Sequence, residues 1–105
     1  MDNTQLLKGV LPTVVLATIA GGHVYGYSIL RSLRSAGFAD VGDASVYGTL
    51  QRLFSDGQVS AYMDSSERGP DRKCYALTPL GTRTLRSGRQ SWSAFQASVD
   101  AIVNA

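Results

Sequence analysis

The sequence predicts a mainly α-helical fold with one small β-hairpin. Apolar residues recur at helical spacing in four segments, and two β-like runs lie between the third and the fourth of them. The last segment also carries an apolar stripe along its length. Because 44% of the 105 residues are hydrophobic and 17% are charged, the composition is that of a folded globular chain of one domain.

The first two helices are expected at residues 4–20 and 25–35. The first carries a helical apolar pattern at Leu7, Val10, Leu11, Val14, Val15 and Ile19. Pro12 lies inside it, and because proline lacks the N–H that a helix interior uses, the helix either kinks there or begins there. Gly21-Gly22 ends the first helix, and Gly37 ends the second.

A third helix is expected from Asp43, as its N-cap, to Asp56. Val46, Leu50 and Leu53 form its apolar face, with Tyr47 and Phe54 joining them. The remaining face is small and polar, and it consists of Ala44, Ser45, Gly48, Thr49, Gln51 and Arg52. Such a face is the right size to enter a DNA major groove.

The β-like runs, 58–63 and 73–77, flank a turn-rich stretch at 64–71 and predict a hairpin. Thr78-Pro79 is a strong helix start, because threonine caps well and proline loses nothing at the first helical position. The order of three helices, ribbon and helix predicts a winged helix-turn-helix at 1–77 and a C-terminal dimerisation helix at 78–105.

The terminal helix carries a seam whose members are separated by three, four, three, four and three residues. They are Leu85, Gly88, Trp92, Phe95, Val99 and Ile102. This spacing is typical of a coiled coil, so the helix is expected to pair with a partner.

Composition and motifs argue against an enzyme. His23 and Cys74, the one residue of each type, lie in unrelated contexts, and no phosphate-binding loop follows a strand. We therefore expect no catalytic residue, metal or cofactor. One cysteine excludes an internal disulfide and is compatible with the cytoplasm, and the apolar run at 9–20 is too short to span a membrane.

Stretches in fixed order resemble a known family. They include Leu6-Leu-Lys-Gly9, Tyr25-Gly-Tyr-Ser-Ile29, Ala44-Ser-Val-Tyr-Gly-Thr-Leu-Gln-Arg-Leu53 and Arg68-Gly-Pro-Asp-Arg-Lys-Cys-Tyr-Ala-Leu-Thr-Pro-Leu-Gly81. They are similar to the opening, the His-Gly-Tyr-x-Ile element, the recognition helix and the wing of the PadR family of transcriptional regulators, in its short form with one C-terminal helix. The sequence departs from that pattern at Tyr25 (His in the family), Gly48 (Pro), Cys74 (Tyr) and Pro12.

The resemblance implies binding to double-stranded DNA. On the recognition helix the expected contacts are Ser45, Tyr47, Thr49, Gln51 and Arg52. Around the wing turn, Arg68, Arg72 and Lys73 offer cations to the backbone or the minor groove. Tyr27 and Tyr47 are expected to pack in the core, with their hydroxyls available to a phosphate.

The resemblance also implies a homodimer that represses transcription from a palindromic operator. Residues expected at the dimer interface or an effector site are Leu7, Leu11, Leu85, Trp92, Phe95, Val99 and Ile102. Family precedent suggests a small hydrophobic or aromatic effector between the subunits. The alternatives are a winged-helix adaptor that binds protein without specific DNA binding, and an RNA-binding winged helix.

Overall fold

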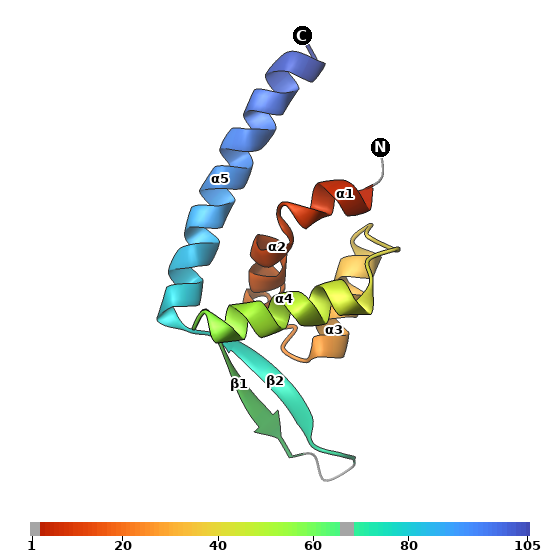
Figure 1. Cartoon of the computed structure of the whole chain (residues 1–105), viewed down its shortest axis with the longest axis vertical. Coiled ribbons are helices and arrows are strands. Elements are labelled where there is room, and N and C mark those ends of the chain that lie inside the picture. Colours follow the sequence, from red (N-terminus) through yellow and green to blue (C-terminus); the bar gives the residue numbers. More distant parts are fainter. Residues whose placement is uncertain (1–2, 66–68) are drawn as a thin grey trace.

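The computed structural model describes residues 3–65 and 69–105 and confirms the expected fold class (Figure 1). Its elements in chain order are α1 (Asn3–Lys8), α2 (Leu11–Ala20), α3 (Gly26–Ser35), α4 (Asp43–Ser55), β1 (Val59–Asp64), β2 (Arg72–Leu77) and α5 (Pro79–Val103). The hairpin extends from one end of the molecule, whereas α1 and the C-terminal end of α5 lie toward the other end.

The expected first helix is in fact two helices. α1 ends at Lys8, and α2 begins at Leu11 with Pro12 in its first turn. A continuous helix would have needed an N–H from Pro12 toward the Lys8 carbonyl, and the proline ring would have collided with that carbonyl. The expectation of one helix over 4–20 is therefore wrong, and the alternative of a start near Pro12 is confirmed.

The turn between α3 and α4 is held by Arg34. Its guanidinium donates to the Val41 carbonyl oxygen at 3.2 and 3.0 Å and to the Asp43 carboxylate at 2.9 Å. Asp43 therefore pairs with α3 and is the first residue of α4, whose N-cap position is occupied by Gly42. The prediction that Asp43 caps this helix is wrong: the extended residue before the helix is Gly42, and the Asp43 carboxylate is paired with Arg34.

The core is built around α2, which contacts α3, α4, α5 and β2. Val15 and Leu16 of this helix are completely buried, and Ile29, Val46 and Leu50 pack into the same cluster from α3 and α4. A central helix without charge, LPTVVLATIA, suits this position, because most of its residues face other elements.

The hairpin pairs β1 and β2 in antiparallel register from Val59 opposite Leu77 to Asp64 opposite Arg72. An isolated bridge between Tyr25 and Cys74 adds a third, single-residue rung on the other edge of β2. This bridge attaches the hairpin to the start of α3.

At the other end of the hairpin, Thr78 joins three elements. Its hydroxyl donates to the Gly57 carbonyl at 2.6 Å and accepts from the Gly81 N–H at 3.1 Å, which confirms the predicted N-cap of α5. Its N–H donates to the Gln58 carbonyl at 3.1 Å. A Cβ at position 81 would overlap that carbonyl, so only glycine allows α5 to start this close to the end of α4.

The C-terminal part of α5 projects from the rest of the chain (Figure 1). Leu85 is buried, and Gly88 lies against Thr13 of α2 so closely that a Cβ would come within 2.5 Å of the threonine hydroxyl oxygen. From 89 to 105 every residue is exposed. Among the described residues, no helix combines the length and apolar character that crossing a membrane requires.

Candidate nucleic-acid interface

The exposed face of α4 carries Ser45, Gly48, Gln51 and Arg52, as the sequence predicted. Apart from the backbone of α4 and the two neighbouring residues, no heavy atom of the described residues lies within 4 Å of the place where a Cβ of Gly48 would be. The middle of this face is therefore open to a molecule that approaches α4.

Thr49 lies on the opposite face, contrary to the prediction. Only 1% of it is exposed, and its hydroxyl donates to the Ser45 carbonyl oxygen at 2.7 Å. Positions 46, 49, 50 and 53 form one buried stripe along the helix. The small side chain of Thr49 can be buried in this stripe because its hydroxyl is hydrogen-bonded to the helix backbone. Direct contact between the Thr49 side chain and a ligand is therefore ruled out in this conformation.

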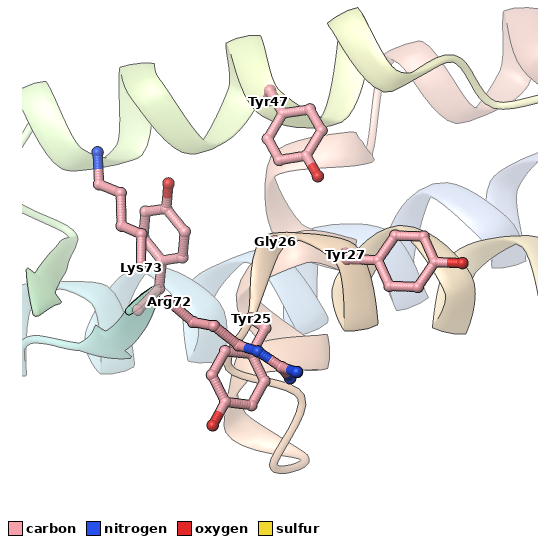
Figure 2. Close-up of a pocket in the computed structure, with 7 residues that line it drawn as sticks. Tyr25, Gly26, Tyr27, Tyr47, Arg72 and Lys73 are labelled. Carbon is pink, nitrogen blue, oxygen red and sulfur yellow. The ribbon is translucent and has the colours of Figure 1, made fainter. Parts of the chain in front are cut away.

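Tyr47 and Tyr27 are exposed, by 43% and 64%, so the expectation that they pack in the core is wrong. Tyr47 crosses from α4 to the start of α3 and lies over Gly26, where a Cβ would come within 2.6 Å of the ring (Figure 2). Tyr27 points away from α4, and the Arg31 guanidinium lies 5.8 Å from its ring centroid. Phe54, also assigned to the apolar face, is 46% exposed.

A surface pocket of about 360 Å³ opens where α3, α4 and the hairpin meet (Figure 2). Its lining consists of Tyr25, Gly26, Tyr27, Tyr47, Arg72, Lys73 and Tyr75. Four tyrosine rings and two cations thus surround one hollow. The structure brings together four residues that the sequence had assigned to DNA binding from three separate segments, namely Tyr27, Tyr47, Arg72 and Lys73.

The two wing cations leave opposite faces of β2. The Lys73 ammonium extends toward α4 and lies 5.8 Å from the ring centroids of both Phe54 and Tyr75. Arg72 stacks on Tyr25, with its guanidinium carbon 5.3 Å from the ring centroid. Such cation–π contacts hold long side chains in place while their charges remain accessible. Arg68, the third predicted wing cation, lies outside the described residues.

Sequence reasoning did not predict the partner of Tyr25. Its hydroxyl donates to the Asp64 carboxylate at 2.6 Å, and this hydrogen bond, more than any other influence, raises the pKa of the tyrosine. The two residues are 39 positions apart, and no local pattern links them. Burial raises the pKa of the neighbouring Tyr75.

The predicted dimer or effector set divides into two groups. Leu7, Leu11 and Leu85 are buried in the chain's own core, so their assignment to a surface for a partner is wrong. Apolar spacing alone did not reveal that α1, α2 and the start of α5 bury these side chains in one shared core. The other four members, Trp92, Phe95, Val99 and Ile102, are exposed on the projecting part of α5. The Trp92 and Phe95 rings lie 6.3 Å apart, centroid to centroid.

Two helices joined by an ion-paired turn, an exposed second helix and an antiparallel hairpin beside it define a winged helix-turn-helix protein. Residues 15–87 match the model of the transcriptional regulator PadR-like family. The chain belongs to this family, which is one of transcriptional regulators and not of enzymes.

Two solved structures and one further protein are similar to this chain over nearly its whole length. A PadR-like transcriptional regulator from Bacillus cereus is 33% identical, with a TM-score of 0.87, and the match covers 96% of this chain and 98% of that one. A Streptococcus transcriptional regulator is 36% identical, with a TM-score of 0.84 and coverage of 94% and 97%. An uncharacterised protein of Lysinibacillus sphaericus is 26% identical over 102 residues, which are 95% of this chain and 94% of that one.

Proposed function

We propose that the chain binds operator DNA as a homodimer and represses transcription in the cytoplasm. The observation that carries this proposal is the convergence of α3, α4 and β2 on one pocket, with Lys73 extending toward α4 and two exposed tyrosines, Tyr27 and Tyr47, in its lining. A groove-binding helix needs phosphate contacts on either side of it to fix its register on the duplex.

In this proposal α4 enters the major groove. Ser45 and Gln51 face base edges, and Arg52 contacts a base or a phosphate, since all three are exposed on the same helix. Gly48 between them leaves room for close approach of the DNA. Thr49 supports the helix from inside, while its Oγ accepts a long hydrogen bond of 3.5 Å from Arg52.

The pocket takes a backbone phosphate. Tyr27 and Tyr47 offer hydroxyl donors from α3 and α4, and Arg72 and Lys73 offer charge from the wing. Contacts of this kind add affinity without reading sequence and make binding sensitive to salt.

The exposed seam on α5 supports the homodimer. Trp92, Phe95, Val99 and Ile102 would be covered by the same surface of a second copy, because a seam with alternating spacings of three and four fits another helix. A twofold dimer presents two copies of α4 and therefore favours a palindromic site. The paired Trp92 and Phe95 rings offer a stacking surface to a small aromatic effector that would release the operator by shifting the population of dimer conformations.

The test is operator affinity measured as a function of salt. Lys73→Gln should weaken binding to the chain's own upstream promoter DNA and lower the slope of log affinity against log salt by about one for each lost phosphate contact. Arg83→Gln is the matched control. It also removes one exposed charge, but from α5, which is outside both the hairpin and α4.

Equal slopes for wild type and Lys73→Gln would show that the wing does not contact phosphate. Light scattering on the same samples reports the oligomeric state. A monomer without DNA preference would instead support the protein-binding adaptor.

A further inference from the structure

Tyr25 connects the helix-turn-helix to both strands of the hairpin. Its backbone carbonyl starts α3 by accepting from the N–H of Ile29 and the hydroxyl of Ser28, each at 2.9 Å. Its hydroxyl donates to Asp64 on β1 at 2.6 Å, and its ring carries Arg72 of β2 at 5.3 Å. A single residue therefore contacts three elements at once.

The contacts fall at the outer end of the hairpin. Asp64 and Arg72 face each other as the last pair of the ladder, whereas the backbone bridge from Tyr25 reaches β2 two residues further in, at Cys74. An isolated two-stranded hairpin has little stability of its own in water. The tyrosine side chain adds a contact to each strand at this outer end of the hairpin.

We infer that Tyr25 is a positioning residue for DNA binding: together with Asp64 and Arg72 it forms a clasp that fixes the direction of the wing relative to α4. The inference rests on the proposed function for its effect on affinity, but the clasp itself is a property of the free protein. It assigns Arg72 a structural task, whereas Lys73, on the other face of the strand, extends toward α4.

The chemistry of the clasp supports this assignment. A hydroxyl–carboxylate hydrogen bond of 2.6 Å is short and charge-assisted, and such bonds are stronger than neutral ones. A tyrosine hydroxyl, with its ordinary pKa of 10.0, is protonated at neutral pH and can donate there, and the bond to Asp64 raises that pKa further. Arg72, directly opposite Asp64, stacks on the same ring and completes the contact with the second strand.

The first measurement is amide hydrogen exchange of the full-length protein without DNA. Tyr25→Phe keeps the ring under Arg72 but removes the hydroxyl, and we expect several-fold faster exchange at the ladder amides of Asp64 and Arg72, with α2 unchanged. Tyr62→Phe is the control, because Tyr62 lies on the same hairpin and no hydrogen bond of its hydroxyl to a described residue is found. Equal exchange in Tyr25→Phe and wild type would overturn the inference.

The second measurement is operator affinity in a double-mutant cycle with Asp64. Tyr25→Phe and Asp64→Ala should each weaken binding by roughly three- to tenfold, and the double variant should be no weaker than either. Asp64→Asn keeps a carbonyl acceptor and should retain most of the affinity. Additive losses would mean that the two residues act independently and would overturn the clasp.

These two measurements separate the two proposals. If wild type binds no operator while Tyr25→Phe still loosens the hairpin, the proposed function fails and the clasp stands. If wild type binds and both the exchange and the cycle show no coupling, the clasp fails and the proposed function stands.

Discussion

The body of the molecule, up to Gly88, and the projecting segment of residues 89–105 differ in how their apolar side chains are covered. In the body, side chains such as Val15 and Leu16 are completely buried by their own chain. On the projection, side chains of similar character, such as Phe95 and Ile102, are exposed. The comparison teaches that helical periodicity identifies an apolar face but does not say whether the chain itself or a second molecule covers it.

The largest expected effect belongs to the body. Leu16→Ala should lower the free energy of unfolding by about 2–5 kcal/mol, because it leaves a cavity in the centre of the core. Urea unfolding followed by circular dichroism measures it. Leu6→Ala removes the same atoms from an exposed position on α1 and should cost little. Similar losses for both variants would erase the distinction between a closed core and an open surface.

On the projection, Trp92→Ala should weaken the dimer rather than the fold. Truncation of a central interface tryptophan typically costs about 2 kcal/mol or more, roughly a 30-fold rise in the dimer Kd. Sedimentation equilibrium over a range of concentrations measures that constant. Gln96→Ala, on the same exposed helix, is the control. A Kd unaffected by Trp92→Ala would mean that the seam is not the interface.

A smaller effect is expected within α4. Gly48→Ala should raise the free energy of unfolding by about 0.5–1 kcal/mol, since alanine favours the helix and its Cβ meets open space. Gly26→Ala should do the opposite, because its Cβ would press on the Tyr47 ring. Thermal unfolding of the two variants compares an open glycine with a crowded one. Destabilisation by Gly48→Ala would show that this face is already occupied.

The smallest effect is a pH dependence at Tyr75. Burial raises its pKa above the ordinary value of 10.0, so the folded chain holds the phenolic proton more tightly than the unfolded chain does. The resulting contribution to stability is complete below pH 10 and is lost as pH rises through the folded-state pKa. Tyr75→Phe should flatten the alkaline part of a plot of unfolding free energy against pH. Identical slopes for the two proteins would contradict this assignment.

Local chemistry made much of the fold predictable from sequence. Thr78-Pro79 starts a helix through its own atoms, and the same holds for the alternative start near Pro12. Thr49 was predicted to be exposed and Tyr47 to be buried, and both predictions were wrong. The buried face of a helix depends on which elements pack against it, and a single sequence does not give these. The absence of a side chain at Gly26 leaves room for the Tyr47 ring over the start of α3, and this proximity is not visible in the sequence.

The candidate site was partly predictable for the same reason. Arg72 and Lys73 were identified because cations beside a Gly-Pro turn are a local signal. The bond between Tyr25 and Asp64 was not, because it joins residues 39 positions apart and arises from the register of the hairpin. Buried Leu7 and Leu85 could not be distinguished from exposed Phe95 by spacing alone.

The junction at Thr78 makes α5 a lever. At 1.5 Å per residue the 25-residue helix is about 37 Å long, so a rotation of roughly 5° at its base moves its far end by about 3 Å. Thr78 is bonded to Gly57 and to the backbone of Gln58, just beyond α4, which makes α4 the short arm of that lever. In the proposed dimer, a slight change of angle where the two α5 helices cross would thus alter the distance between the two α4 helices.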